Sequence, residues 1–214
     1  MIETENLILD KAKFSDWIEM YRNVWSQPES ARYMEWTITT SEEAAKIRIT
    51  KTIAFQKEHD TYLVYEKTSG KAIGFAGVEE IEPLIYQEAG ICLGPGYVGK
   101  GFGRQILQGL IQYCRERFGA KEFIYSVRDE NTASNRLAES FGFSLVSSDD
   151  RSAATVSNIF AGDAEPYTPN TIPTNVKANA RILTSRSNRT NTKKESRYFE
   201  IYVPNAFIGY FTPL

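Results

Sequence analysis

The feature that most constrains this chain is a glycine-rich loop at residues 94–103, placed between an apolar run and a segment with helical periodicity. The run at 89–93 is short and mostly apolar, which predicts a buried strand. After the loop, apolar side chains recur with the i, i+3, i+4, i+7, i+8 spacing of a helix that buries one face. These apolar positions are Ile106, Leu107, Leu110, Ile111 and Cys114. The order along the chain is therefore strand, glycine loop, helix.

The glycines of this loop predict an anion-binding site. Gly99, Gly101 and Gly103 alternate directly before the helix and leave the backbone bare, so that a ligand can approach closely. The first N–H groups of a helix have no partner within it, and the helix dipole places positive charge at the same end. Phosphate is the usual ligand of such a helix start. A turn that binds no ligand is the alternative.

Two common nucleotide-binding motifs fit this loop poorly. Gly94 to Lys100 matches the G-x-x-x-x-G-K of a P-loop, but Gly101 stands where the Ser or Thr that holds magnesium is needed. The dinucleotide pattern G-x-G-x-x-G also fails, because the spacing here is G-x-G-x-G. An NTP-binding protein is therefore the weaker interpretation of the loop.

The loop instead resembles the acetyl-CoA loop of the GNAT N-acetyltransferases. The family pattern Gln/Arg-x-x-Gly-x-Gly/Ala falls on residues 98–103, with Val98 in place of the Gln or Arg. Residues 131–143 resemble the family's N-x-x-S-x-x-L…GF segment. Glu88-Ala89-Gly90 resembles the Glu-x-Gly that opens the equivalent strand in the RimJ/RimL-like branch.

The resemblance implies an α+β GNAT fold, in which a mixed central sheet with helices on both faces is splayed between strands 85–93 and 122–127. The helix between these strands independently predicts a parallel, right-handed crossover. The implied reaction is transfer of acetyl from acetyl-CoA, a cosubstrate that needs no metal, to a primary amine of a protein N-terminus or a small molecule. A non-catalytic acyl-CoA-binding or interaction protein is the alternative.

Backbone amides carry most of the cofactor binding that the resemblance implies. The amides of 98–104 take the pyrophosphate, and the unpaired backbone of 91–93 takes the pantetheine arm. An N–H near Cys92 stabilises the thioester oxygen when it becomes anionic. The predicted cofactor-binding residues are Ile91, Cys92, Leu93, Val98, Gly99, Lys100, Gly101, Phe102, Gly103, Arg104, and, from the downstream motif, Asn131 and Ser134.

Glu88 is the predicted general base, acting directly or through a water. On a regular strand its side chain shares one face with those of Gly90 and Cys92. Partial burial would raise the pKa of its carboxyl toward a useful value. The alternative for Glu88 is an exposed strand residue paired with a Lys or Arg, and Glu35 is the rival base.

The resemblance also places the acceptor pocket at the aromatic loop around residues 33–36. The predicted substrate-binding residues are Tyr33, Glu35 and Trp36. A loop that only packs its aromatic side chains on the core is the alternative. Ala138 stands where many relatives carry a Tyr that protonates the leaving thiolate.

The whole chain predicts one domain with one insertion. Residues 1–147 and 195–214 form the acetyltransferase domain, and 198–203 predict its last strand. The stretch 148–194 is rich in Ser, Thr and Asn and predicts an insertion that is mostly loop. The apolar tail 206–211 is predicted to pack on the domain's own surface or on the partner subunit of a homodimer. Further predicted elements are strands 7–9, 61–66, 72–78 and 143–146 and helices 15–25, 41–58 and 133–140.

Composition narrows the expected partners. With Lys+Arg 25 against Asp+Glu 27, the net charge of -2 does not suggest a nucleic-acid surface. No apolar run reaches membrane length and the start does not resemble a signal peptide, so we expect a cytoplasmic protein that binds no membrane. Cys92 and Cys114 are predicted to be buried thiols, and His59 is the only histidine, so no metal site is predicted.

Overall fold

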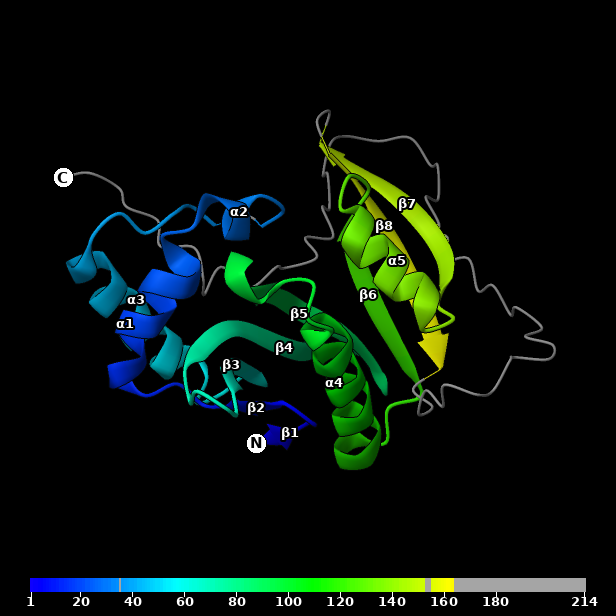
Figure 1. Ribbon diagram of the computed structural model, residues 1–214. Coiled ribbons are helices and arrows are strands. Elements are labelled where there is room, and N and C mark those ends of the chain that lie inside the picture. Colours follow the sequence, from blue (N-terminus) through cyan, green and yellow to red (C-terminus); the bar gives the residue numbers. More distant parts are fainter. Residues whose placement is uncertain (35, 153–154, 164–214) are drawn as a thin grey trace, which may run out of the picture.

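The computed structural model describes residues 1–34, 36–152 and 155–163. Its strands form one mixed sheet in the order β1-β2-β3-β4-β5-β6-β8-β7 (Figure 1). The strands are β1 (Ile2–Glu3), β2 (Leu7–Asp10), β3 (Thr61–Glu66), β4 (Ala72–Glu82), β5 (Ile85–Leu93), β6 (Glu122–Arg128), β7 (Ser144–Ser152) and β8 (Thr155–Asp163).

Helices flank the sheet, and local sequence signals set their ends. The side chain of Ser41 accepts a hydrogen bond from the N–H of Ala44 and starts α3. Gly119 ends α4 with a φ of 70°, a conformation that glycine adopts without strain. The helical segments are η1 (Phe14–Asp16), α1 (Trp17–Met20), η2 (Tyr21–Trp25), α2 (Pro28–Ala31), α3 (Glu42–Phe55), η3 (Pro95–Tyr97), α4 (Phe102–Phe118) and α5 (Thr132–Ser140).

Two hydrophobic clusters cover the two faces of the sheet. One cluster joins the buried side of α4 to β1–β6, and the other joins α1, η2 and α3 to β3, β4 and β5. The neighbours Leu63 and Val64 of β3 belong to different clusters, as the alternation of side chains along a strand requires. Figure 1 shows α4 and the pair α1 and α3 on different sides of these strands. The predicted α+β architecture with helices on both faces is confirmed.

The sheet is splayed where the sequence predicted it. β5 and β6 are parallel, but only Ile85, Tyr86 and Gln87 pair, with the first three residues of β6. Every other strand pairing among the described residues is antiparallel. The strands then separate, so residues 88–93 of β5 and 125–128 of β6 bound an opening that we call the wedge.

Part of the stretch 148–194, which was predicted to be mostly loop, is a strand. Residues 155–163 form β8, which pairs with the whole of β6 from Glu122↔Asp163 to Arg128↔Ser157. β7 is also longer than the expected strand 143–146 and ends at Ser152. The reason is that β6 needs a partner on its outer edge, since an unpaired edge leaves a row of open backbone groups. Residues 164–194, the expected strand 198–203 and the tail 206–211 lie outside the described residues.

None of the helices in the described part of the chain has the length and apolar character needed to cross a membrane. Within the same residues, no group of three or more His, Cys, Asp or Glu side chains could hold a metal ion. Cys92 and Cys114 are buried free thiols, as predicted.

Candidate functional site

The start of α4 holds a row of backbone N–H groups beside the wedge. Gly99 and Gly101 have φ values of 81° and 78°, which side chains other than glycine rarely adopt. Gly101 is the N-cap of α4 and its carbonyl accepts from Gln105. Among the residues that the structure describes, no acceptor receives the N–H groups of 99–103. These donors and the positive end of the helix dipole make an anion site.

Gly103 is the most informative glycine of the loop. A Cβ added there would meet only the Leu137 side chain, at 3.7 Å, which is ordinary van der Waals contact. The fold therefore does not require glycine at this position, unlike at Gly99 and Gly101. A ligand that lies against the backbone would explain it.

The charged residues of the loop point to different sides of it. Arg104 donates to the Ser140 hydroxyl at 2.7 Å and lies over the Phe141 ring, so it ties α4 to α5. Lys100 lies over the Tyr97 ring and lines a cavity of about 550 Å³. That cavity is also lined by Arg22, Asn23, Gln27, Glu66, Ser69, Lys71, Pro95 and Gly96, and by no residue of β6 or α5. The Lys100 side chain thus lies on the η2 side of the loop, whereas its amide belongs to the anion site.

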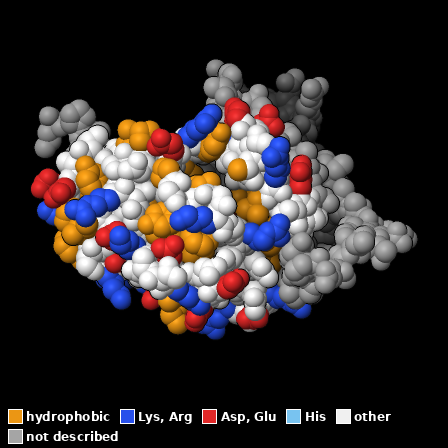
Figure 2. Space-filling view, in the orientation of Figure 1, with side chains coloured by type: hydrophobic (Ala, Val, Ile, Leu, Met, Phe, Trp, Pro, Cys, Tyr) orange, Lys and Arg blue, Asp and Glu red, His pale blue; other side chains and the backbone are white. Residues whose placement is uncertain are grey.

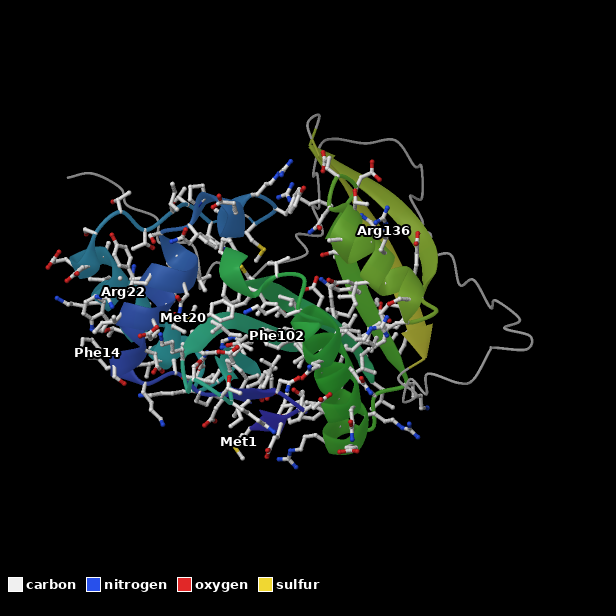
Figure 3. The ribbon with its side chains drawn as sticks, in the orientation of Figure 1. Met1, Phe14, Met20, Arg22, Phe102 and Arg136 are labelled. Carbon is white, nitrogen blue, oxygen red and sulfur yellow. The ribbon has the colours of Figure 1, made fainter. Side chains whose placement is uncertain are left out.

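Figure 3 gives the spatial order of these groups. In this view Phe102, at the start of α4, lies between Arg22 and Arg136, which stands on α5. Phe102 is 7% exposed and packs in the α4 cluster, so its side chain anchors the helix start while its backbone stays available. Val98 is 61% exposed. Figure 2 shows Lys and Arg side chains interspersed with hydrophobic ones across this face, without one large charged patch.

The end of β5 offers an open backbone edge. Ile91, Cys92 and Leu93 pair with β4 on one side, at Ala76, Phe75 and Gly74. Their other side faces the wedge, where pairing with β6 has ended. This is the geometry that the predicted pantetheine contacts need.

A bulge in β5 decides where the Glu88 side chain points. Ala89 and Gly90 together oppose the single residue Gly77, and Gly90 has a φ of 94°. The extra residue shifts the alternation, so Glu88 lies on the α4 face, like Tyr86, whereas Cys92 belongs to the opposite cluster. The expectation that Glu88 and Cys92 share a face is therefore wrong.

Glu88 is buried and held by backbone donors on both sides of the wedge. Its carboxylate accepts from the N–H of Gly90 at 2.6 Å and from the backbone of Ser126 in β6. Burial raises the pKa of Glu88 to about 8, although both backbone hydrogen bonds lower it. The side chain is not the exposed, ion-paired residue that was the alternative.

A phenol on β6 joins this group. Burial raises the pKa of Tyr125, which hydrogen-bonds with Ser134 and feels the charge of Glu88. Sequence analysis missed Tyr125, because within an apolar strand it shows no sign of a site. The side-chain oxygen of Asn131 accepts from the Ser134 N–H at 3.2 Å and caps α5, and Ala138 is fully buried in the core.

The aromatic loop crosses the mouth of the wedge. The Tyr33 hydroxyl donates to the carbonyl of Glu130 at 3.3 Å, and Arg128 donates to the carbonyl of Tyr33 at 3.0 Å. Met34 lies over the bulge, since its Cε is 3.6 Å from where a Cβ of Gly90 would be. Trp36 is 5% exposed and packs in the core, as the alternative expected. Glu35, the rival base, lies outside the described residues.

Comparison with known proteins agrees with this geometry. The family described as "Acetyltransferase (GNAT) domain" matches residues 6–144. An uncharacterized N-acetyltransferase of Bacillus licheniformis is 29% identical over 143 residues, which are 65% of this chain and 80% of that protein. The N-alpha-acetyltransferase RimI of Mycobacterium tuberculosis is 32% identical over 100 residues, which are 44% of this chain and 60% of that protein.

Solved structures show the same fold. A GNAT-family acetyltransferase from Bacillus anthracis has a TM-score of 0.66 at 19% identity, over 76% of this chain and 98% of that one. The ribosomal L7/L12 alpha-N-protein acetyltransferase RimL, in complex with coenzyme A, has a TM-score of 0.64 at 21% identity. That match covers 76% of this chain and 97% of RimL.

Proposed function

The chain belongs to the GNAT acetyltransferase family, and on that premise we propose that it transfers acetyl from acetyl-CoA to a primary amine, foremost the α-amine of a protein N-terminus. The observation that best supports this proposal is the row of N–H groups at 99–103, which have no acceptor among the described residues and lie directly beside the open edge of β5. The names of RimI and RimL, both N-alpha-acetyltransferases, favour a protein N-terminus over a small-molecule amine.

Each part of the wedge has a place in binding acetyl-CoA. The amides of 99–103 and the N-terminus of α4 take the pyrophosphate. The open edge of 91–93 takes the amides of the pantetheine arm and brings the thioester to the bulge. An N–H of this edge stabilises the negative charge that develops on the thioester oxygen.

In the reaction the amine nitrogen attacks the thioester carbon, the C–S bond breaks, and coenzyme A leaves as a thiolate. An alkylammonium has a pKa of roughly 10, so the amine must first lose a proton. Glu88, whose pKa of about 8 makes it a stronger base than an ordinary carboxylate, accepts this proton through a bridging water. Tyr125 is the candidate donor to the thiolate, because Ala138 has no proton to give.

The test is acetyl transfer to a panel of amines: peptides with free N-termini, polyamines and aminoglycosides. We expect release of free coenzyme A with the peptides, and mass spectrometry should find one acetyl group on the terminal nitrogen. Tight binding of coenzyme A without turnover on any amine would instead support the non-catalytic acyl-CoA-binding protein. A preference for ATP with magnesium over coenzyme A in thermal shift would overturn both.

A further inference from the structure

A half-buried arginine on α3 has two buried N–H groups that lack an acceptor among the described residues. The Arg48 guanidinium lies between two indole rings, 4.8 Å from the centre of Trp25 and 4.4 Å from that of Trp36. Its Nη1 donates to the hydroxyl of Thr39 at 3.0 Å. Its Nε and Nη2 are buried, and no described residue supplies an acceptor for either.

The two unpaired groups form one edge of the guanidinium. Nε–H and the adjacent Nη2–H are parallel donors, and this edge is the one that takes both oxygens of a carboxylate side by side. Burial lowers the pKa of Arg48 to about 10, so the group still carries its charge at neutral pH. A buried charge without a counter-ion is costly, and buried unpaired donors are rare enough to need an explanation.

Neighbouring side chains present more donors than acceptors. The indole N–H groups of Trp25 and Trp36 and the hydroxyl of Ser30 are also buried without a partner among the described residues. An indole N–H and a guanidinium can only donate. The missing ligand is therefore rich in acceptor oxygens and negatively charged.

This cluster lies on the side of β5 opposite the anion site. The Cys92 thiol donates to the carbonyl of Ser30 at 3.5 Å, and the charge of Arg48 lowers the pKa of that thiol against the effect of burial. Cys92 belongs to the cluster formed with α1 and α3, whereas the glycine loop opens onto the α4 side. Trp36 comes from the loop that crosses the mouth of the wedge, and its ring centre lies 4.4 Å from the Arg48 guanidinium.

We propose that Arg48 binds a carboxylate carried by the acyl acceptor, so that the substrate is an amine with an acidic group, such as a peptide with an acidic residue near its N-terminus. This inference rests on the proposed function and specifies its substrate class. Because Trp36 is only 5% exposed and stacks on Arg48, binding of the carboxylate at the Nε/Nη2 edge requires this ring to move. The other source of the same chemistry is Glu35, the residue before Trp36, and the experiment distinguishes the two.

The experiment compares C-terminally amidated tetrapeptides that differ only in Asp against Asn, or Glu against Gln, at the first or second position. We expect the wild-type protein to acetylate the acidic member of a pair with a kcat/KM about a hundredfold higher. Arg48→Met keeps the length and apolar packing and should abolish this preference, while the KM for acetyl-CoA stays unchanged. Arg48→Lys is the second variant, in case Arg48→Met does not fold. It keeps the charge but not the paired Nε–H and Nη2–H donors, and it should retain only part of the preference.

The matched control is Lys46→Met, which removes a half-exposed cation from the same helix and should leave the preference intact. Equal rates with acid and amide in the wild-type protein would overturn the inference while leaving acetyl transfer established. Glu35→Gln is also made in the wild-type protein and in Arg48→Met, and the melting temperatures are compared. If Glu35→Gln changes the melting temperature in the wild-type background but not in Arg48→Met, and the choice of peptide does not, then Glu35 is the partner of Arg48 and the inference is overturned. If no peptide is acetylated, the proposed function fails, and calorimetric binding of the acidic and amide peptides still decides whether Arg48 selects a carboxylate.

Discussion

The two sides of β5 present their unpaired hydrogen-bond donors from different parts of the chain. On the α4 side the donors are backbone N–H groups at consecutive positions 99–103, held by glycines with positive φ. On the opposite side the donors are side chains of Trp25, Trp36 and Arg48, which come from three separate segments. In the proposed reaction the backbone site would bind an invariant part of the cosubstrate, whereas a side-chain site can be adapted to one acceptor without altering the cofactor loop.

This difference predicts that substitutions on one side leave the other side intact. Changes in the loop should raise the Kd for coenzyme A without changing the choice of acceptor. Substitutions around Arg48 should change the choice of acceptor and leave the Kd for coenzyme A unchanged. Between the two sides lies the bulge, with Glu88 pointing to one face and Cys92 to the other, and substitutions there should affect turnover.

The largest expected effect comes from Glu88→Gln. It removes the proposed base at the junction of the two sides, and turnover at pH 7 should fall about a hundredfold, a usual contribution of general-base catalysis. The wild-type rate should rise through pH 8 as the carboxyl ionises, and this inflection should vanish in the variant. The loss should shrink at higher pH, because more of the amine is then already neutral. Steady-state rates between pH 6 and 10 provide the measurement.

Glu35→Gln is the control for this assignment. If Glu35→Gln loses turnover and Glu88→Gln keeps it, the base belongs to the aromatic loop. Glu88 would then serve only to hold β5 to β6 through the N–H groups of Gly90 and Ser126.

A smaller effect is expected on stability against pH. The pKa of Glu88 is raised in the folded protein, so its protonated form is the one that the fold favours. Its contribution to stability is fully present below the unfolded pKa near 4.5 and is lost as pH rises through about 8. The melting temperature of the wild-type protein should therefore fall more steeply between pH 5 and 9 than that of Glu88→Gln. Parallel curves would contradict the buried environment of this carboxyl.

The smallest expected effect is that of Tyr33→Phe. The substitution removes the hydrogen bond that links the aromatic loop to Glu130 across the mouth of the wedge. Because one such bond contributes about 0.5–1.5 kcal/mol, the KM for the acceptor peptide should change by only a few-fold. The Kd for coenzyme A should not change. An equal change in both constants would show that the loop does not belong to the acceptor side alone.

The row of donors at the start of α4 could be predicted from the sequence because its elements are contiguous. A strand, alternating glycines and an amphipathic helix within 26 residues, 89–114, determine where an anion can lie. The splay between β5 and β6 followed from the resemblance, and the structure has it. The sequence singles out Glu88 as the candidate base, a role that stays a prediction. The direction of its side chain was predicted wrongly, because the alternation of side chains along a strand does not reveal the bulge at Gly90.

The unpaired donors around Arg48 could not be predicted in the same way. In the sequence, Arg48 looks like an ordinary polar position of a surface helix. Only the three-dimensional packing brings its guanidinium over the rings of Trp25 and Trp36. β8 was missed for a related reason. The surrounding composition, rich in Ser and Asn, indicated a loop although the segment contains Val156, Ile159 and Phe160. The strand conformation of β8 is set by its pairing with β6, which is far away in sequence.

The most direct test of the central claim is binding of coenzyme A to Gly103→Asp, measured by calorimetry. At this position the fold tolerates a Cβ, but a carboxylate would occupy the anion site. The matched control is Gly96→Asp, which adds the same charge to the same loop where nothing lies within 4 Å. We predict that Gly103→Asp weakens coenzyme A more than about tenfold, or about 1.4 kcal/mol, with the melting temperature retained and the control near wild type. Equal affinity in wild type and Gly103→Asp would contradict the assignment of the pyrophosphate to the start of α4.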